Sequence, residues 1–156
     1  MPHQNQYCTF YLQDHFFGIV VSEAREAIRY QEMTRIPLAP AVVAGLINLR
    51  GQIVTAIDLR RRFGMPPRPA DQLPMNVIVR ADDGEVSLLV DKIGDVIEVD
   101  ANTFEPLPDT LQDVATDLIR GVYKLDGRLM LVLDTAAAIN CSADDSKGTR
   151  AAPAIS

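Results

Sequence analysis

The chain contains one hairpin pattern twice, first as Gly45-Leu-Ile-Asn-Leu-Arg-Gly51-Gln-Ile-Val-Thr-Ala-Ile-Asp58 and again as Gly121-Val-Tyr-Lys-Leu-Asp-Gly127-Arg-Leu-Met-Leu-Val-Leu-Asp134. Each copy reads as an apolar strand, a two-residue turn ending in Gly, a second apolar strand and an Asp that opens a short helix. Gly provides turn backbone that residues with a Cβ resist. The Asp side chains are expected to cap helices 59–63 and 135–140. The predicted structural turn and cap residues are therefore Gly45, Gly51, Asp58, Gly121, Gly127 and Asp134.

The repeat extends upstream of both hairpins. Residues 18–21 (Gly-Ile-Val-Val) align with 87–90 (Ser-Leu-Leu-Val), and 26–28 align with 95–97. Two tandem units of about 65 residues, each with several short strands, favour a pair of small β-barrels that share a core. We expect one folded domain over residues 6–140, with lobes of about 14–65 and 70–140 and a proline-rich linker at 64–69. Residues 1–5 and 141–156 are expected to be disordered tails.

Local patterns predict the smaller features. Tyr7–Leu12 and Phe16–Val21 should form a hairpin, and residues 28–36 should form a further strand. The basic triplet 60–62 is interpreted as a solvated helix face. The turn Asp126-Gly127 suits type I′. For Arg50-Gly51, two readings stay open: a strain-free type II turn with only Gly51 at positive φ, or an Arg kept at an exposed tip for recognition.

Composition excludes several classes of function. The chain has 156 residues, of which 47% are hydrophobic, and a formal charge of −6, which argues against a general nucleic-acid binder. Its sequence has no 18-residue apolar run, so no membrane insertion is expected. It also begins without a secretory signal pattern, so a cytoplasmic location is expected.

The sequence offers little for catalysis. Phosphate-loop, nucleophile-elbow and dinucleotide motifs are absent from it. Cys8, Cys141, His3 and His15 do not have the spacing of a metal site. We therefore expect no enzymatic activity, no metal and no cofactor, and interpret the chain as a binding module.

Residues 45–54, followed by Asp58-Leu-Arg60 and preceded by Ile36-Pro-Leu-Ala-Pro40, resemble the signature of the CheW-like domain family. Val90-Asp91-Lys92-Ile93-Gly94-Asp95-Val96 and the second hairpin support the resemblance, which covers about residues 6–140. It implies a mostly β fold of two intertwined five-stranded SH3-like barrels with a few short helices. It also implies a non-catalytic cytoplasmic adaptor, recruited to membrane receptor arrays in bacterial chemotaxis.

The implied partners are the regulatory domain of a CheA-type histidine kinase and the cytoplasmic tip of a methyl-accepting receptor. By the family pattern, the receptor docks on an apolar groove near the junction of the barrels. This pattern assigns receptor binding to Val21, Ala24, Glu26, Ala27 and Arg50.

Three departures keep alternatives open. Ala24 and Ala27 replace larger apolar residues of the family, and Thr55 stands where the family signature usually has Pro. Trimming a docking surface weakens or retunes binding, since each buried CH₂ contributes about 0.8 kcal/mol. One alternative is an adaptor of a pilus, gliding or surface-sensing pathway. Another, of a different class, is a small-ligand sensor that uses the groove between the barrels.

Overall fold

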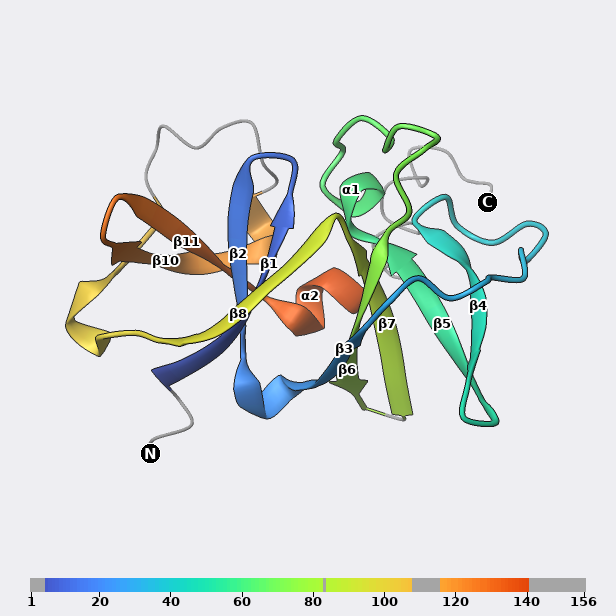
Figure 1. Ribbon diagram of the computed structural model, residues 1–156, viewed down its shortest axis with the longest axis horizontal. Helices are drawn as coiled ribbons and strands as arrows, with labels where there is room; N and C mark the ends of the chain where they lie inside the picture. Colours follow the sequence, from blue (N-terminus) through green and yellow to red (C-terminus); the bar gives the residue numbers. More distant parts are fainter. Residues whose placement is uncertain (1–4, 83, 108–115, 141–156) are drawn as a thin grey trace.

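The structure is a computed structural model that describes residues 5–82, 84–107 and 116–140, and its strands form two sheets (Figure 1). Sheet A has the order β8-β1-β2-β11-β10-β9 and sheet B the order β3-β6-β7-β5-β4. The strands of sheet A are β1 (Gln6–Leu12), β2 (His15–Val20), β8 (Lys92–Glu98), β9 (Phe104–Glu105), β10 (Ile119–Leu125) and β11 (Arg128–Leu133). Those of sheet B are β3 (Ala24–Ile28), β4 (Val43–Leu49), β5 (Gln52–Asp58), β6 (Met75–Ala81) and β7 (Gly84–Val90).

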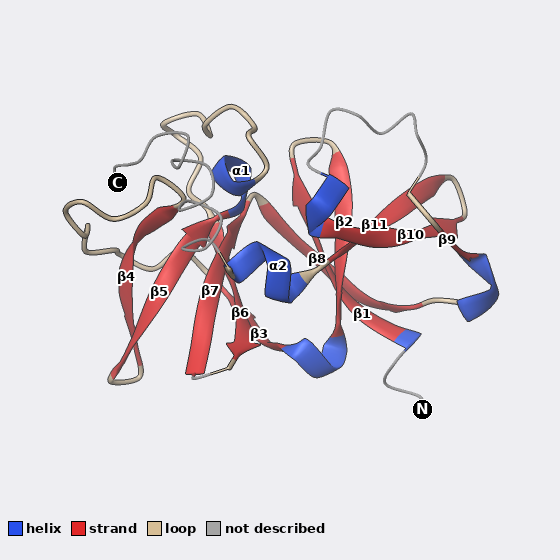
Figure 2. Cartoon of the chain, turned by 180° about the vertical axis from the view of Figure 1, so that it is seen from behind, coloured by secondary structure: helices blue, strands red, loops and turns tan. Residues whose placement is uncertain are grey.

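Short helices lie between strands and after the last strand, β11 (Figure 2). The 3₁₀ turns are η2 (Val21–Glu23), η3 (Ala101–Thr103) and η4 (Thr116–Leu118), and the α-helices are α1 (Leu59–Arg62) and α2 (Thr135–Ile139). The two predicted helix caps are confirmed: Asp58 accepts a hydrogen bond from the Arg60 amide at 3.1 Å, and Asp134 accepts one from the Ala137 amide at 3.2 Å. The two sheets confirm the expected mostly β fold of two SH3-like barrels.

The two sequence repeats exchange their first hairpins. β4, β5 and α1 of the first repeat match β10, β11 and α2 of the second, and both hairpins contain a register shift beside the repeated Gly, at Gly45 and Gly121. However, β1 and β2 of the first repeat pair with strands of the second, and β6 and β7 of the second pair with strands of the first. Two parallel contacts, β5 with β7 and β11 with β2, join the exchanged parts.

This exchange corrects the expected lobe boundary. Segment 64–69 connects α1 to β6, and both flanking strands, β5 and β6, belong to sheet B. The chain instead passes between the sheets at η2, after β2, and at Asp91, after β7. Local sequence did not reveal this because Pro and Gly mark a loop without specifying which strands the loop joins.

Each barrel closes through a short pairing that follows its edge strand. After β3, Thr34 pairs with Leu46 of β4, and their amides and carbonyls exchange two hydrogen bonds of 2.8 Å. After β8, β9 pairs in the same way with β10. A Cβ at Gly45 would lie 2.7 Å from the Thr34 carbonyl oxygen, and a Cβ at Gly121 would lie 2.8 Å from the Glu105 carbonyl oxygen. The repeated glycines are therefore needed for barrel closure.

The apolar residues divide into three cores. Each barrel has a small core of its own, around Met130 in sheet A and around Ile78 in sheet B. A larger core lies between the sheets and includes Phe10, Phe17, Leu59, Leu88 and Ala138. Residues 16–19 of β2 and 87–90 of β7 are buried throughout, since one face of each strand contacts a barrel core and the other the shared core.

Three local predictions differ from the structure. Residues 29–33 do not form a strand. Within 28–36, only Ile28, the last residue of β3, and Thr34, in an isolated bridge, make β-sheet pairings. The basic triplet is not a solvated face, since Arg60 is buried and Arg62 donates hydrogen bonds to the carbonyls of Ala137 and Ala138. Asn5, expected in a disordered tail, accepts a hydrogen bond from the Val99 amide at 2.8 Å. Residues 1–4 and 141–156 lie outside the described residues.

A buried ion-pair network fixes the point where the chain crosses from sheet B to sheet A. Asp91 accepts hydrogen bonds from Arg60 Nη2 at 2.6 Å, Arg68 Nε at 2.8 Å and the Gln13 amide at 2.7 Å. Arg68 also contacts Asp58 at 3.0 Å. Burial alone would raise the pKa of Asp91, but the bonds from Arg60 and Gln13, with the charge of Arg68, hold that pKa below its usual value. The network thus connects α1, the 64–69 loop and the β1–β2 turn.

We expect Asp91→Asn to destabilise the domain by about 3–5 kcal/mol, because Arg60 and Arg68 would remain buried without their counter-charge. Because the folded-state pKa of Asp91 is lowered, its contribution is present above the unfolded-state pKa of about 3.9 and is lost as pH falls through the folded value. Urea unfolding of the parent protein and of the variant, at pH 7 and at lower pH, measures the difference in the free energy of unfolding and its dependence on pH.

The matched control is Glu105→Gln, which removes the exposed pair of Glu105 with Lys124. This control should change the free energy of unfolding by less than about 1 kcal/mol. Equal stability of Asp91→Asn and parent protein would show that the network does not hold the sheets together.

Candidate functional site

An apolar groove lies where the two sheets meet edge to edge. β3 is the outer strand of sheet B and β8 the outer strand of sheet A, and the groove between them has a volume of about 230 Å³. We call it the junction groove; its walls are formed by Cys8, Thr9, Phe10, Ala24, Arg25, Glu26, Ala27, Val77, Ile93, Gly94 and Val96. Val96 is 59% exposed, so one wall of the groove presents a large apolar side chain to solvent. Burial raises the pKa of the Cys8 thiol, which favours its neutral form in the groove.

The structure brings most of the predicted receptor-binding residues to this groove. Ala24, Glu26 and Ala27 lie on β3 and line it directly. Val21 lies in η2, immediately before β3, and does not line the groove. Arg50 lies at the tip of the β4–β5 hairpin and reaches Glu26 from the opposite edge of sheet B. The residues therefore share one region, with Val21 at its margin.

Arg50 and Glu26 form a direct ion pair. Arg50 Nη2 lies 2.5 Å from Glu26 Oε1, and the side chains are 66% and 29% exposed. The hydrogen bond from Arg50, with its charge, lowers the pKa of Glu26, and the same contact raises the pKa of Arg50. Both groups stay charged, so they present a polar element beside the apolar groove. The expected proximity of the two residues is confirmed; a role in recognition stays a prediction.

The turn that holds Arg50 differs from the strain-free reading. Arg50 has φ 54° and Gly51 has φ 85°, so both central residues have positive φ, as a type I′ turn requires. Asn48 supports this turn, since its Oδ1 accepts a hydrogen bond from the Gly51 amide at 3.0 Å. In the second hairpin only Gly127 has positive φ, so the type I′ prediction for Asp126-Gly127 is wrong. Arg50 occupies a conformation that disfavours a long side chain, as often occurs at functional sites.

A second exposed apolar region lies on the far side of sheet B, and sequence reasoning missed it. Ile53 on β5 is 64% exposed beside Tyr30, Met33 and Leu46, which line the same depression. We call these four residues the outer patch. Successive residues of a strand point to opposite faces, so the burial of Val54 places Ile53 on the other face of β5. This alternation was the sequence signal that could have indicated the exposed Ile53. The irregular course of residues 29–33, which brings Tyr30 and Met33 beside it, has no sequence signature.

Known proteins resemble this chain over nearly its full length. The family model described as the CheW-like domain matches residues 6–142. The chain belongs to the CheW-like domain family. Its relatives include the chemotaxis protein CheW of Treponema pallidum, 30% identical over 84% of this chain and 79% of that protein, and CheW of Bacillus subtilis, 29% identical over 83% of each. The crystal structure of the scaffolding protein TtCheW from Thermoanaerobacter tengcongensis superposes with a TM-score of 0.79 at 28% identity, covering 90% of this chain and 94% of that one.

CheW-like domains are chemotaxis scaffold proteins, and the geometry here is consistent with a scaffold. The described part of the chain contains no group of three or more His, Cys, Asp or Glu side chains that could hold a metal ion. Over the same residues, none of the helices has the length and apolarity needed to span a membrane. The features that stand out are surfaces: the junction groove, the Arg50–Glu26 pair and the outer patch.

We expect Arg50→Asn to leave the thermal midpoint unchanged or to raise it by about 3 °C at most, because Asn adopts positive φ in a type I′ turn more readily than Arg does. The variant also removes the pair with Glu26. Thermal unfolding followed by circular dichroism checks this. A large fall in the midpoint would instead make Arg50 a scaffold residue.

Proposed function

We propose that this protein is a non-catalytic adaptor that couples methyl-accepting chemoreceptors to a CheA-type histidine kinase. Membership of the CheW-like family supports this role. The single observation that carries it is the presence of two separate exposed apolar surfaces on one small domain, because an adaptor must hold two partners at once. The adaptor acts in the cytoplasm, at membrane receptor arrays.

The receptor tip docks in the junction groove. The groove is open, apolar and bordered by the charged Arg50–Glu26 pair, so it offers an apolar centre and a polar rim. Both of its bordering strands, β3 and β8, are sheet edges, and their exposed side chains are available to a helical hairpin. Apolar contact supplies affinity there, and the ion pair orients the partner.

The regulatory domain of the kinase contacts the outer patch. Ile53, Tyr30, Met33 and Leu46 offer a separate apolar surface on sheet B. This placement leaves the junction groove free for the receptor. A barrel-to-barrel contact at this patch is consistent with a kinase domain of similar fold.

A pilus, gliding or surface-sensing pathway is the second candidate setting. The observation that favours it is the small size of Ala24 and Ala27, which widens the junction groove. A cavity of about 150 Å³ accommodates a benzene ring, so this groove has room for a bulky apolar side chain. The receptor of this pathway therefore presents a larger residue than the receptors that bind narrower grooves.

The decisive experiment measures binding of a receptor tip and of a kinase regulatory domain to two surface variants. Val96→Asp should weaken receptor binding at least about tenfold and leave kinase binding unchanged, because a desolvated carboxylate disfavours the apolar contact. Ile53→Asp should do the reverse. Each variant thus serves as the control for the other. Loss of both interactions in one folded variant, or of neither in both, would contradict two separate docking surfaces.

A double-mutant cycle tests the Arg50–Glu26 pair. Arg50→Ala should weaken receptor binding, by about tenfold if the pair borders the central contact, while its thermal midpoint stays near that of the parent. Combining Glu26→Arg with Arg50→Glu should recover part of the loss if the contact between the two side chains matters. Parent-like binding by Arg50→Ala would remove this arginine from the receptor site.

A further inference from the structure

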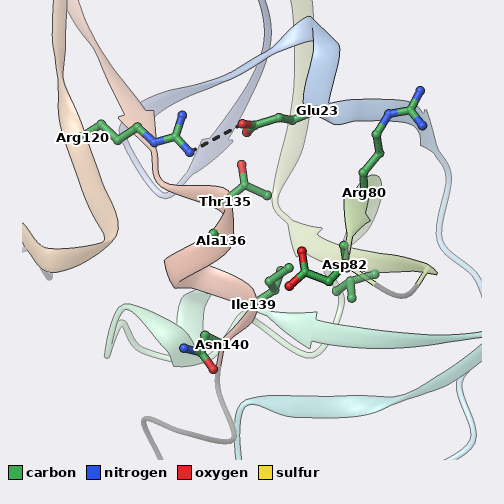
Figure 3. A pocket seen from close by; sticks show the side chains of 10 residues that line it. Glu23, Arg80, Asp82, Arg120, Thr135, Ala136, Ile139 and Asn140 are labelled. Atoms are coloured by element: carbon green, nitrogen blue, oxygen red, sulfur yellow. Dashed lines mark ion pairs between the residues drawn. The ribbon is translucent and has the colours of Figure 1, made fainter.

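A polar pocket lies beside α2, between the end of η2 and the β6–β7 turn (Figure 3). Its volume is about 600 Å³, within the range of about 300–1,000 Å³ that is typical of small-molecule sites. We call it the η2–α2 pocket; its lining consists of Glu23, Arg80, Ala81, Asp82, Val86, Arg120, Thr135, Ala136, Ile139 and Asn140. Glu23 belongs to η2, Asp82 and Asn140 follow β6 and α2, and the other residues lie on β6, β7, β10 and α2; none of the ten lines the junction groove.

Two oxygen atoms in this pocket have no hydrogen-bond partner. Thr135 is 3% exposed, and its Oγ1 bonds to nothing in the described structure. Glu23 Oε1 is also buried and has no hydrogen-bond partner, although the other carboxylate oxygen, Oε2, lies 3.5 Å from Arg120 Nη2. Buried polar atoms in native proteins nearly always have a partner, so Glu23 Oε1 lacks a donor and the Thr135 hydroxyl, which can donate or accept, lacks a partner. Figure 3 shows the Thr135 hydroxyl directed toward Glu23.

The charges around the pocket favour a cation as that donor. The Asp82 side chain lies on the wall opposite Glu23 and points inward, whereas the Arg80 guanidinium points away (Figure 3) and donates from Nε to the Ser22 carbonyl. The charged groups that face inward are thus two carboxylates, Glu23 and Asp82, and one guanidinium, that of Arg120, which leaves one negative charge in excess. Glu23 and Asp82 do not form part of any three-residue group in the described chain that would hold a metal ion. An organic cation needs no such ligand group, and the pocket volume of about 600 Å³ has room for one.

We propose that the η2–α2 pocket binds a primary ammonium group carried on an alkyl chain, as in a small aliphatic diamine. The ammonium donates to Glu23 Oε1 and to Thr135 Oγ1. The methylenes lie on the apolar side chains of Val86 and Ile139. Arg120 does not prevent this, since its Nη2 contacts the other carboxylate oxygen of Glu23, Oε2, at 3.5 Å and leaves Oε1 without a partner.

The pocket also adjoins the segment that leads to the junction groove. Glu23 is the last residue of η2, and the next residue, Ala24, begins β3 and lines the groove. A ligand at Glu23 and a receptor on β3 would therefore contact adjacent residues of one segment. This inference goes beyond the adaptor role and does not depend on it.

Calorimetric titration of the isolated 156-residue protein with 1,4-diaminobutane tests the proposal. We expect saturable one-site binding that Glu23→Gln weakens more than about tenfold, because the acceptor loses its charge. Thr135→Val should weaken binding about three- to tenfold, the contribution of one hydrogen bond. Its thermal midpoint should stay level or rise, because the removed hydroxyl has no partner in the free protein.

Matched controls separate a site from general attraction to an acidic protein. Glu98→Gln removes an exposed charge on β8, outside the pocket, and should leave affinity within about twofold. The neutral analogue 1,4-butanediol should not bind. Titration with Nα-acetyl-lysine methylamide distinguishes the two possible sources of the ammonium group. Binding of this compound in place of the diamine would show that the pocket takes a lysine side chain of another protein.

The proposal is overturned if neither amine shows saturable binding at about 10 mM, or if butanediol binds as well as the diamine. Equal weakening by Glu23→Gln and Glu98→Gln would also overturn it, since the attraction would then be unspecific.

Discussion

The fold depends on how the chain is held where it crosses between the sheets. Asp91 follows β7 of sheet B and precedes β8 of sheet A, and it is bound there by two buried arginines and the Gln13 amide. Arg60 belongs to α1, and Arg68 belongs to the loop that connects α1 to β6. If this crossing point shifted, β8 would move relative to β3, and the junction groove lies between these two strands. The position of the junction groove at the surface thus depends on a buried charge network.

Exchange of hairpins between the repeats makes each sheet depend on both of them. Each sheet contains strands from both repeats, so neither repeat has a complete sheet of its own. The shared core contains residues from both, including Phe17 from the first and Leu88 from the second. The barrels are joined by this core and by two chain crossings. The edge strands β3 and β8 are left beside each other as a consequence, which creates a groove without any segment dedicated to it.

The functional surfaces use features that stability alone would not favour. Arg50 has positive φ, and Val96 and Ile53 are exposed apolar side chains on strands. Thr135 and Glu23 retain buried oxygens without partners. Each feature departs from a local rule of protein structure, and each lies at a surface or pocket for which we propose a partner. The Arg50–Glu26 pair is partly exposed, so the role proposed for it rests on its place beside the groove rather than on burial.

The sequence by itself determined the local elements. The repeated Gly and Asp positions predicted both hairpins and both helix caps, because turn and cap chemistry acts over a few residues. The family signature predicted that Glu26 and Arg50 would lie together. Only the tertiary structure decided which strands pair, since a strand's pattern of buried faces does not name its neighbour. For the same reason, the exchange of hairpins, the burial of Arg60 and the pocket at Thr135 were not predictable: each depends on contacts between residues far apart in the chain.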